Sequence, residues 1–167
     1  MGFTRQQIAD ACRAHAGDLD ASLLAGYDAA KLMWAICGNE SSFGANCTPR
    51  HEPAFDVSGT YAKAPAQAAL LAKYGSHAAC SYGPMQVMLV NAPEGYAPAD
   101  FDDVDKAIAA GAFALNRLME HWKPVSLAQF GAVYNCGHIP KIVSPGVHEY
   151  QDELIRNYHD VPMPVAV

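Results

Sequence analysis

The chain has 167 residues, of which 51% are hydrophobic and 17% are charged, and its formal net charge at pH 7 is −6. A chain of this length and composition can form one compact domain with a sizeable hydrophobic core, which argues against intrinsic disorder. The negative charge and the lack of any basic run argue against nucleic acid and anionic membrane surfaces as partners.

The first residues predict a short helix. Thr4-Arg5-Gln6-Gln7 has the form of a capping box, and its helix is expected to continue to about His15 and to end at Gly17. Asp20 has the residue type of an N-cap for the next helix, which reaches Glu40. That helix is expected to be central and largely buried, because apolar residues occupy too many of its sides for a surface helix: Leu23, Leu24, Tyr27, Ala30, Leu32, Met33, Trp34, Ile36 and Cys37.

The middle of the chain is less regular. Periodicity disappears between residues 44 and 64, and loops of this length inside compact domains are usually functional or mobile. A short helix is predicted over 65–73, with its end at Gly75. Residues 81–87 are expected to form a glycine turn that leads into a brief apolar element, and residues 91–98 a loop.

Helical signals return in the last third. Asp102 or Asp103 is expected to cap a strong helix that runs to about Trp122, and Pro124 breaks that helix. Ser126-Leu127-Ala128-Gln129 is a second capping-box form and opens another helix.

The end of this helix is predicted at residues 134–137, where Gly137 suits a left-handed C-terminal position. A last helix is expected over 147–158, followed by a loose Pro-rich tail over 161–167. No repeat, linker or low-complexity segment is present. We therefore predict a single, mainly α-helical domain over residues 1–167.

Several kinds of chemistry lack their motifs. The five cysteines include no C-x-x-C; Cys47 and Cys80 lie in predicted loops where they are able to pair, and reduced thiols are the default expectation. No H-x-x-x-H, H-E-x-x-H or G-x-S-x-G pattern occurs. Cys136 beside His138 raises the alternative of a Cys/His peptidase. We expect neither a metal nor a cofactor.

Glu40 is the first candidate for chemistry. It ends the apolar helix, where poor solvation favours the neutral carboxyl and raises its pKa. A general acid that works near neutral pH requires such a shift. On this stretch alone, a solvated glutamate near a helix C-terminus stays open as the alternative.

Three motifs then occur in order: Glu40-Ser41-Ser42-Phe43-Gly44, Ser81-Tyr82-Gly83-Pro84-Met85-Gln86-Val87 and Ala132-Val133-Tyr134-Asn135-Cys136-Gly137. Together they resemble the lysozyme-like lytic transglycosylases, the group of soluble lytic transglycosylases and goose-type lysozymes. The resemblance covers about residues 20–160 and implies a lysozyme-like fold. Two features depart from the family pattern: Pro84 replaces the usual Leu, and the segment from Glu40 to Ser81 is longer than in compact members.

The resemblance implies a role for each motif. Glu40 would protonate the glycosidic oxygen and then act as a base. Met85 would form the floor of a sugar subsite, or be a core methionine, and Tyr150 would face the cleft, or be a core aromatic. Hydrogen bonds to sugar hydroxyls or N-acetyl groups are implied for Ser81, Gln86, Tyr134 and Asn135, and Tyr134 is also expected to steady the oxocarbenium-like charge or to hold Glu40.

A second carboxylate matters only for hydrolysis. A transglycosylase lets Glu40 deprotonate the sugar's own 6-hydroxyl, whereas an inverting hydrolase needs a second carboxylate about 6.5–9.5 Å away to activate water. Glu52 and Asp56 are the candidates, and solvated loop acids are the alternative for both. Glu52 is nominated by a faint likeness of Pro49-Arg50-His51-Glu52-Pro53-Ala54-Phe55 to the R-F-E-P stretch that follows the glutamate in some phage-type muramidases.

The expected function is cleavage of the β-1,4 bond between N-acetylmuramic acid and N-acetylglucosamine in peptidoglycan. Lytic transglycosylation is preferred; a hydrolytic muramidase and a non-catalytic peptidoglycan-binding or virion-structural module are the alternatives. The expected partner is the peptidoglycan glycan strand, bound by a monomer with no membrane insertion. Because the N-terminus lacks a signal peptide, we expect a phage product, released through a holin or carried by the virion.

Overall fold

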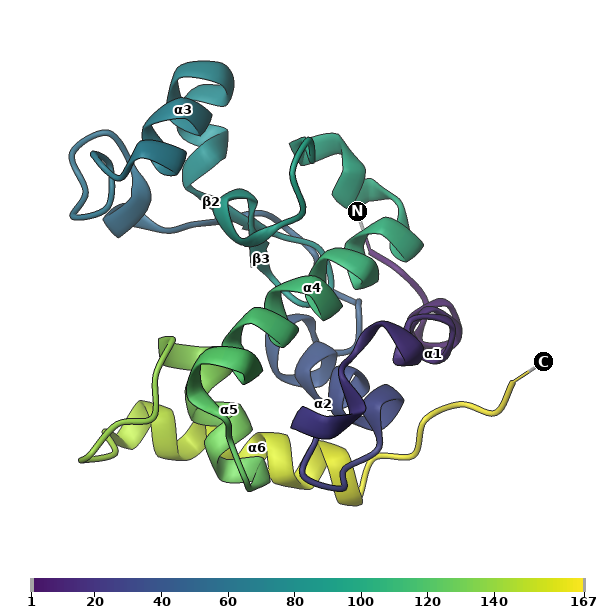
Figure 1. Ribbon diagram of the computed structural model, residues 1–167. Helices are drawn as coiled ribbons and strands as arrows, with labels where there is room; N and C mark the ends of the chain where they lie inside the picture. The colour runs from purple at the N-terminus through teal and green to yellow at the C-terminus, as the bar shows by residue number, and fades with distance from the viewer. Residues whose placement is uncertain (1, 167) are drawn as a thin grey trace.

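The computed structural model describes residues 2–166 and is mainly helical, with helices over 60% of the chain. The described part contains six α-helices and a small antiparallel sheet, which lies between α3 and the larger group formed by the other helices (Figure 1). The helices are α1 Arg5–Ala14, α2 Ala29–Ser41, α3 Pro65–Tyr74, α4 Val104–Trp122, α5 Leu127–Cys136 and α6 Pro145–His159. The strands are β1 Arg50–His51, β2 Cys80–Tyr82 and β3 Val87–Met88. The prediction of a mainly α-helical chain is confirmed.

The N-terminal capping box forms as predicted, but the second helix begins later than expected. Thr4 accepts a hydrogen bond from the Gln7 amide, and the Gln7 side chain accepts one from the Thr4 amide. Asp20 caps only a single 3₁₀ turn. Ala25 and Gly26, just after this turn, take left-handed conformations that interrupt the expected helix. Helix α2 therefore begins later, with Asp28 as its N-cap.

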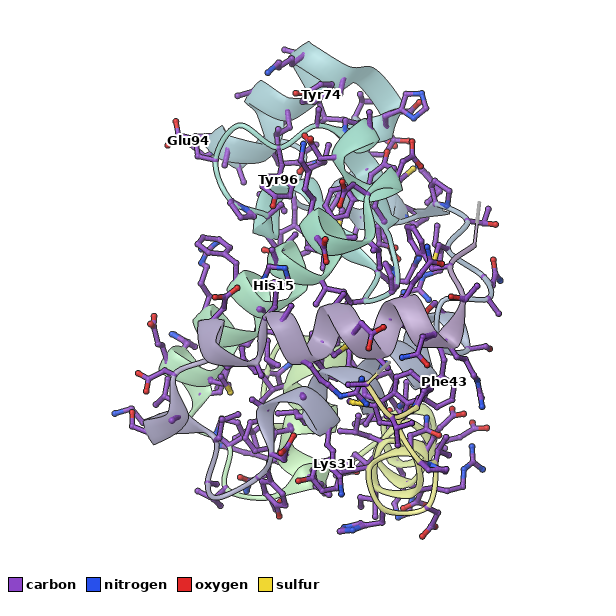
Figure 2. All side chains as sticks on the ribbon, turned by 90° about the vertical axis from the view of Figure 1, so that its right-hand side faces the viewer. His15, Lys31, Phe43, Tyr74, Glu94 and Tyr96 are labelled. Atoms are coloured by element: carbon purple, nitrogen blue, oxygen red, sulfur yellow. The ribbon has the colours of Figure 1, made fainter. Side chains whose placement is uncertain are left out.

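Helix α2 forms the centre of the hydrophobic core, as its all-round apolar pattern predicted. Every residue from Leu32 to Gly38 is buried. Phe43, which follows α2, packs against the Trp34 ring with a centroid distance of 4.4 Å. It lies near the N-terminal end of α1, where the Arg5 guanidinium covers its ring, whereas His15 follows the other end of α1 (Figure 2).

The caps of the C-terminal helices were largely predicted. Asp103, not Asp102, is the N-cap of α4, and Gly137 takes the left-handed conformation after α5. Ser126 caps α5 by accepting a hydrogen bond from the Gln129 amide. The second half of that capping box does not form, because the Gln129 side chain accepts from the Val125 amide instead.

The last residues are held against the rest of the domain, which corrects the expectation of a loose tail for 161–166; residue 167 lies outside the described residues. The Trp34 indole N–H donates to the Val161 carbonyl at 3.2 Å, and Gln6 donates to the Val165 carbonyl at 3.0 Å. The tail therefore joins α1 to α2.

The small sheet has the order β1-β2-β3, and both pairs of strands are antiparallel. Arg50 pairs with Ser81, and Ser81 pairs with Met88. Directly paired residues point to the same face of a sheet, so these three side chains share one face. The expected loop of residues 44–64 thus contributes an edge strand, and the expected glycine turn joins β2 to β3.

Two further findings concern the whole described chain. No helix between residues 2 and 166 is long and apolar enough to cross a membrane. All five cysteines are free thiols, including Cys47 and Cys80, whose pairing was left open by the sequence. Burial raises the pKa of both thiols.

Candidate functional site

A cleft of about 540 Å³ opens between the helices and the sheet. The end of α2, residues 50–61, the sheet, α4 and the end of α5 all contribute to its walls. Arg50, Ser81 and Met88, the three residues that share a face of the sheet, line it together. The two segments farthest apart in sequence that meet here are the end of α2 and the end of α5.

A tight turn at the end of α2 holds Glu40 at the wall of this cleft. Ser42 and Phe43 both take left-handed conformations, and the Phe43 amide donates back to the Cys37 carbonyl at 2.9 Å. The Ser41 hydroxyl donates to the same carbonyl and accepts from the Gly44 amide. These bonds satisfy backbone groups at the helix end, so the last turn is well defined.

Glu40 is nearly buried although it lines the cleft, since its side chain is only 8% exposed. Burial raises its pKa, because a carboxylate is poorly solvated there. Two groups oppose this effect: the Tyr150 hydroxyl donates to Oε1 at 2.8 Å, and Arg50 Nη2 donates to Oε2 at 3.3 Å. The net result is a carboxyl that holds its proton to a higher pH than a solvated glutamate.

Arg50 connects Glu40 to Glu52. Its Nε donates to Glu52 Oε1 at 3.0 Å, while Nη2 contacts Glu40. Both carboxylates line the cleft, and one guanidinium contacts both of them. Sequence reasoning named Glu52 but missed Arg50, although Arg50 belongs to the same muramidase-like stretch and to the polar triplet Arg50-His51-Glu52.

Ser81 and Gln86 form the wall beside Glu52. The Ser81 hydroxyl lies 2.9 Å from Gln86 Oε1 and 3.4 Å from Glu52 Oε1. Gln86 takes a left-handed conformation and donates to the Gly83 carbonyl at 2.9 Å. This strained backbone, in a buried glutamine, directs a polar side chain into the cleft wall. The structure therefore brings these two predicted site residues together with Glu52.

Tyr134 and Asn135 also line the cleft, but Met85 does not. Met85 is completely buried, and a Cβ on Gly111 would lie 2.1 Å from its sulfur, so its side chain belongs to the core below the cleft. Its backbone still supports the site, because the Tyr134 hydroxyl donates to the Met85 carbonyl at 2.7 Å. Of the two alternatives left open for Met85, the floor of a sugar subsite and a core methionine, the structure shows the core methionine.

The two tyrosines near Glu40 remain neutral hydrogen-bond donors. Burial raises the pKa of both phenols, and the nearby Glu40 carboxylate raises them further. Tyr150 comes from α6 and donates a hydrogen bond to Glu40, and it is not among the residues that line the cleft. The alternative in which Tyr134 holds Glu40 is not observed: the Tyr134 hydroxyl donates to the Met85 carbonyl, and the Tyr150 hydroxyl donates to Glu40.

Asp56 lies outside the cleft, which corrects its candidacy as the second carboxylate. It accepts a hydrogen bond from the Val57 amide at 2.7 Å and lies 2.8 Å from His51 Nε2. The hydrogen bond from the Val57 amide is the main cause that lowers the pKa of Asp56, and the hydrogen bond with His51 lowers it further. Its carboxylate is thus committed within its own loop, and Glu52 is the only one of the two candidates that lines the cleft.

Two aromatic residues in the cleft wall were not anticipated as site residues. Phe55 and Tyr61 come from the irregular segment after β1, and their rings lie 4.8 Å apart. Phe55 ends the segment whose likeness nominated Glu52, although it was not itself named as a site residue, and Tyr61 falls on no motif or periodic pattern.

The described residues contain no group of three or more His, Cys, Asp or Glu side chains arranged to hold a metal ion. Comparisons with known proteins found no match to any family, to any curated protein or to any solved structure. What the site does must therefore be argued from its own residues.

Proposed function

We propose that this protein is a peptidoglycan lytic transglycosylase that cleaves the β-1,4 bond between N-acetylmuramic acid and N-acetylglucosamine. The observation that carries the proposal is the Glu40 carboxyl, which is nearly buried, has a raised pKa and lines an open cleft. The three sequence motifs add support, because the structure gathers Glu40, Ser81, Gln86, Tyr134 and Asn135 around that cleft. We also propose a lysozyme-like fold. The mainly helical domain, with its buried helix α2 and its small sheet, is compatible with it.

The reaction follows from the protonation of Glu40. Protonated Glu40 donates its proton to the glycosidic oxygen as the bond from that oxygen to the anomeric carbon breaks. The Glu40 carboxylate then removes the proton of the 6-hydroxyl, whose oxygen closes a 1,6-anhydro ring on the same carbon. Glu40 regains its proton, and no water is consumed. Tyr150 and Arg50 stabilise the carboxylate between the two steps, since both donate hydrogen bonds to it.

Product analysis tests this function. Purified peptidoglycan would be digested with the wild-type protein and with Glu40→Gln, and the released muropeptides would be analysed by mass spectrometry. We expect 1,6-anhydro-muropeptides from the wild type alone. Glycan binding without release of any muropeptide would instead support a non-catalytic module, and reducing ends would support a muramidase.

Hydrolysis is the second candidate because Glu52 lines the same cleft as Glu40 and contacts the same arginine. In that reaction Glu52 would activate a water molecule from the opposite face of the sugar. We favour transglycosylation, because Glu52 is already engaged by Arg50 and lies near the Ser81 hydroxyl.

Glu52→Gln separates the two reactions. For a transglycosylase we expect the rate to fall by less than about tenfold and the anhydro product to persist, since Glu52 holds no reacting proton. The measurement is the rate of muropeptide release together with the mass of the product. Asp56→Asn, which alters a carboxylate outside the cleft, is the matched control and should leave the rate unchanged. A loss of about 10²-fold or more in Glu52→Gln, with reducing ends from the wild type, would establish hydrolysis.

Tyr150→Phe should move the pH dependence of the reaction. The Tyr150 hydroxyl stabilises ionised Glu40 and so lowers its pKa against the effect of burial. Removing that hydroxyl raises the pKa of Glu40, so the protonated form persists to higher pH. The alkaline limb of the pH–rate profile therefore shifts to higher pH. The profile of kcat/KM between pH 4 and 9 measures this shift.

Tyr158→Phe is the control for this prediction. Tyr158 lies on the same helix, and its hydroxyl accepts a hydrogen bond from the Asp28 amide, away from Glu40. Its removal should leave the alkaline limb in place. An unchanged limb in Tyr150→Phe, or an equal shift in both variants, would contradict the role of Tyr150.

A further inference from the structure

The irregular segment after β1 presents an exposed aromatic ring to the cleft. Tyr61 lines the cleft and is 51% exposed, which is unusual for a large ring in a chain whose other aromatic residues largely pack inward. The Phe55 ring lies under it, with the two ring planes inclined by 33° and their centroids 4.8 Å apart. One face of Tyr61 is thus supported by protein while the residue as a whole stays open to solvent.

The backbone of the segment that carries these two rings is tightly packed. The Tyr61 amide donates to the Ala54 carbonyl at 2.8 Å. A Cβ on Gly59 would lie 2.3 Å from the carbonyl oxygens of Ala54 and Pro53, so only glycine allows the backbone to close so tightly there. The loop is therefore a preorganised platform and not an extended flap.

Helix α3 anchors the platform from behind. Gln67 is almost completely buried, and its Nε2 donates to the Phe55 carbonyl at 2.7 Å and to the Ala78 carbonyl at 3.2 Å. The Phe55 amide donates to the Glu52 carbonyl at 3.0 Å. The platform and the Glu52 carboxylate are consequently parts of one connected segment.

We propose that Tyr61, backed by Phe55, is a sugar-stacking platform that binds a pyranose ring of the glycan strand beside the Glu40 site. The C–H face of a pyranose is apolar, and a rigid aromatic ring with a free face covers it at little entropic cost. The same cleft is also lined by the polar residues Ser81, Gln86 and Asn135, which are available for hydroxyl and N-acetyl groups. This assignment rests on the proposed function for the nature of the ligand, and it adds a specificity-determining residue that no sequence motif contains.

The test is binding of the β-1,4-linked tetrasaccharide of N-acetylglucosamine, measured by isothermal titration calorimetry in the Glu40→Gln background so that the ligand is not consumed. We expect Tyr61→Ala to weaken binding about tenfold, which is the scale of one aromatic contact, and Tyr61→Phe to retain it within about twofold. Val57→Ala, in the same loop but outside the cleft lining, should bind like the parent. Thermal melting of each variant would verify that the substitution leaves the fold intact.

Each outcome decides the proposal. Equal affinities of Tyr61→Ala and the parent would overturn it, and so would the absence of tetrasaccharide binding in the parent. Binding that depends on the Tyr61 ring, combined with no muropeptide release by the wild type, would uphold the platform and reject the glycan-cleaving function. The failures of the two proposals are thus distinguishable.

Discussion

Glu40→Gln is expected to lower the rate of peptidoglycan cleavage by about 10²–10⁴-fold, the usual contribution of a positioned general acid. Glutamine has nearly the same shape, and its single side-chain oxygen can still accept a hydrogen bond from one of the two donors, Tyr150 or Arg50, but it has no acidic proton to give to the glycosidic oxygen. The measurement is the rate of muropeptide release at the pH optimum of the wild type. Cleavage at the wild-type rate would show that Glu40 is not the acid.

Stability measurements separate this loss from unfolding. The pKa of Glu40 is raised in the folded protein, so the folded state binds the proton more tightly than the unfolded state does. The wild type therefore loses stability as the pH rises through the unfolded and then the folded pKa, and the variant does not. Relative to the wild type, Glu40→Gln should gain stability between acid and neutral pH, as followed by thermal melting. Glu149→Gln, an exposed glutamate on α6 outside the cleft lining, is the matched control and should change neither activity nor stability.

Gly38→Ala is expected to destabilise the fold by about 1–2 kcal/mol and to impair the site as well. A Cβ at this position of α2 would lie 2.6 Å from Asn157 Nδ2 and 2.7 Å from Phe43 Cζ. Both neighbours are buried, so they cannot turn away into solvent. The cost of this overpacking exceeds the gain of up to about 1 kcal/mol that alanine usually brings to a helix interior.

The same substitution affects the proposed catalytic residue, Glu40, through a chain of hydrogen bonds. Asn157 donates to Asn39 Oδ1 at 2.8 Å, and Asn39 donates to the Tyr150 carbonyl at 2.9 Å. Displacement of Asn157 would therefore shift Tyr150, whose hydroxyl holds Glu40. Activity should fall even at temperatures where the variant is fully folded.

Denaturant unfolding measures the effect of Gly38→Ala, with Gly146→Ala as the matched control. Gly146 lies in α6, where an added Cβ meets nothing within 4 Å, so alanine there should be neutral or stabilising by up to about 1 kcal/mol. If Gly38→Ala were as stable as Gly146→Ala, the close packing of α2 against α6 would not contribute as argued.

The local signals in this sequence predicted local structure well. The Thr4 box, the Ser126 cap and the left-handed Gly137 all occur where expected, because each depends on hydrogen bonds between residues no more than about four positions apart. The prediction of a long helix starting at Asp20 was wrong for the same reason. A capping side chain acts locally and does not show that the helix continues, and the left-handed Ala25 and Gly26 interrupt the chain after one turn.

By itself the sequence determined that the chain is mainly helical, and it identified Glu40 as a carboxyl at the end of a buried helix. The tertiary structure alone decided what surrounds that carboxyl. Pairing of β1 with β2 brings Arg50 opposite Ser81, 31 residues away, and so places one guanidinium between Glu40 and Glu52. The same folding sends Met85 into the core, keeps Asp56 within its loop and exposes Tyr61. The pairing of β1 with β2 and the contacts across the cleft join segments that are distant in sequence, and neither periodicity nor capping residues show which distant segments will meet.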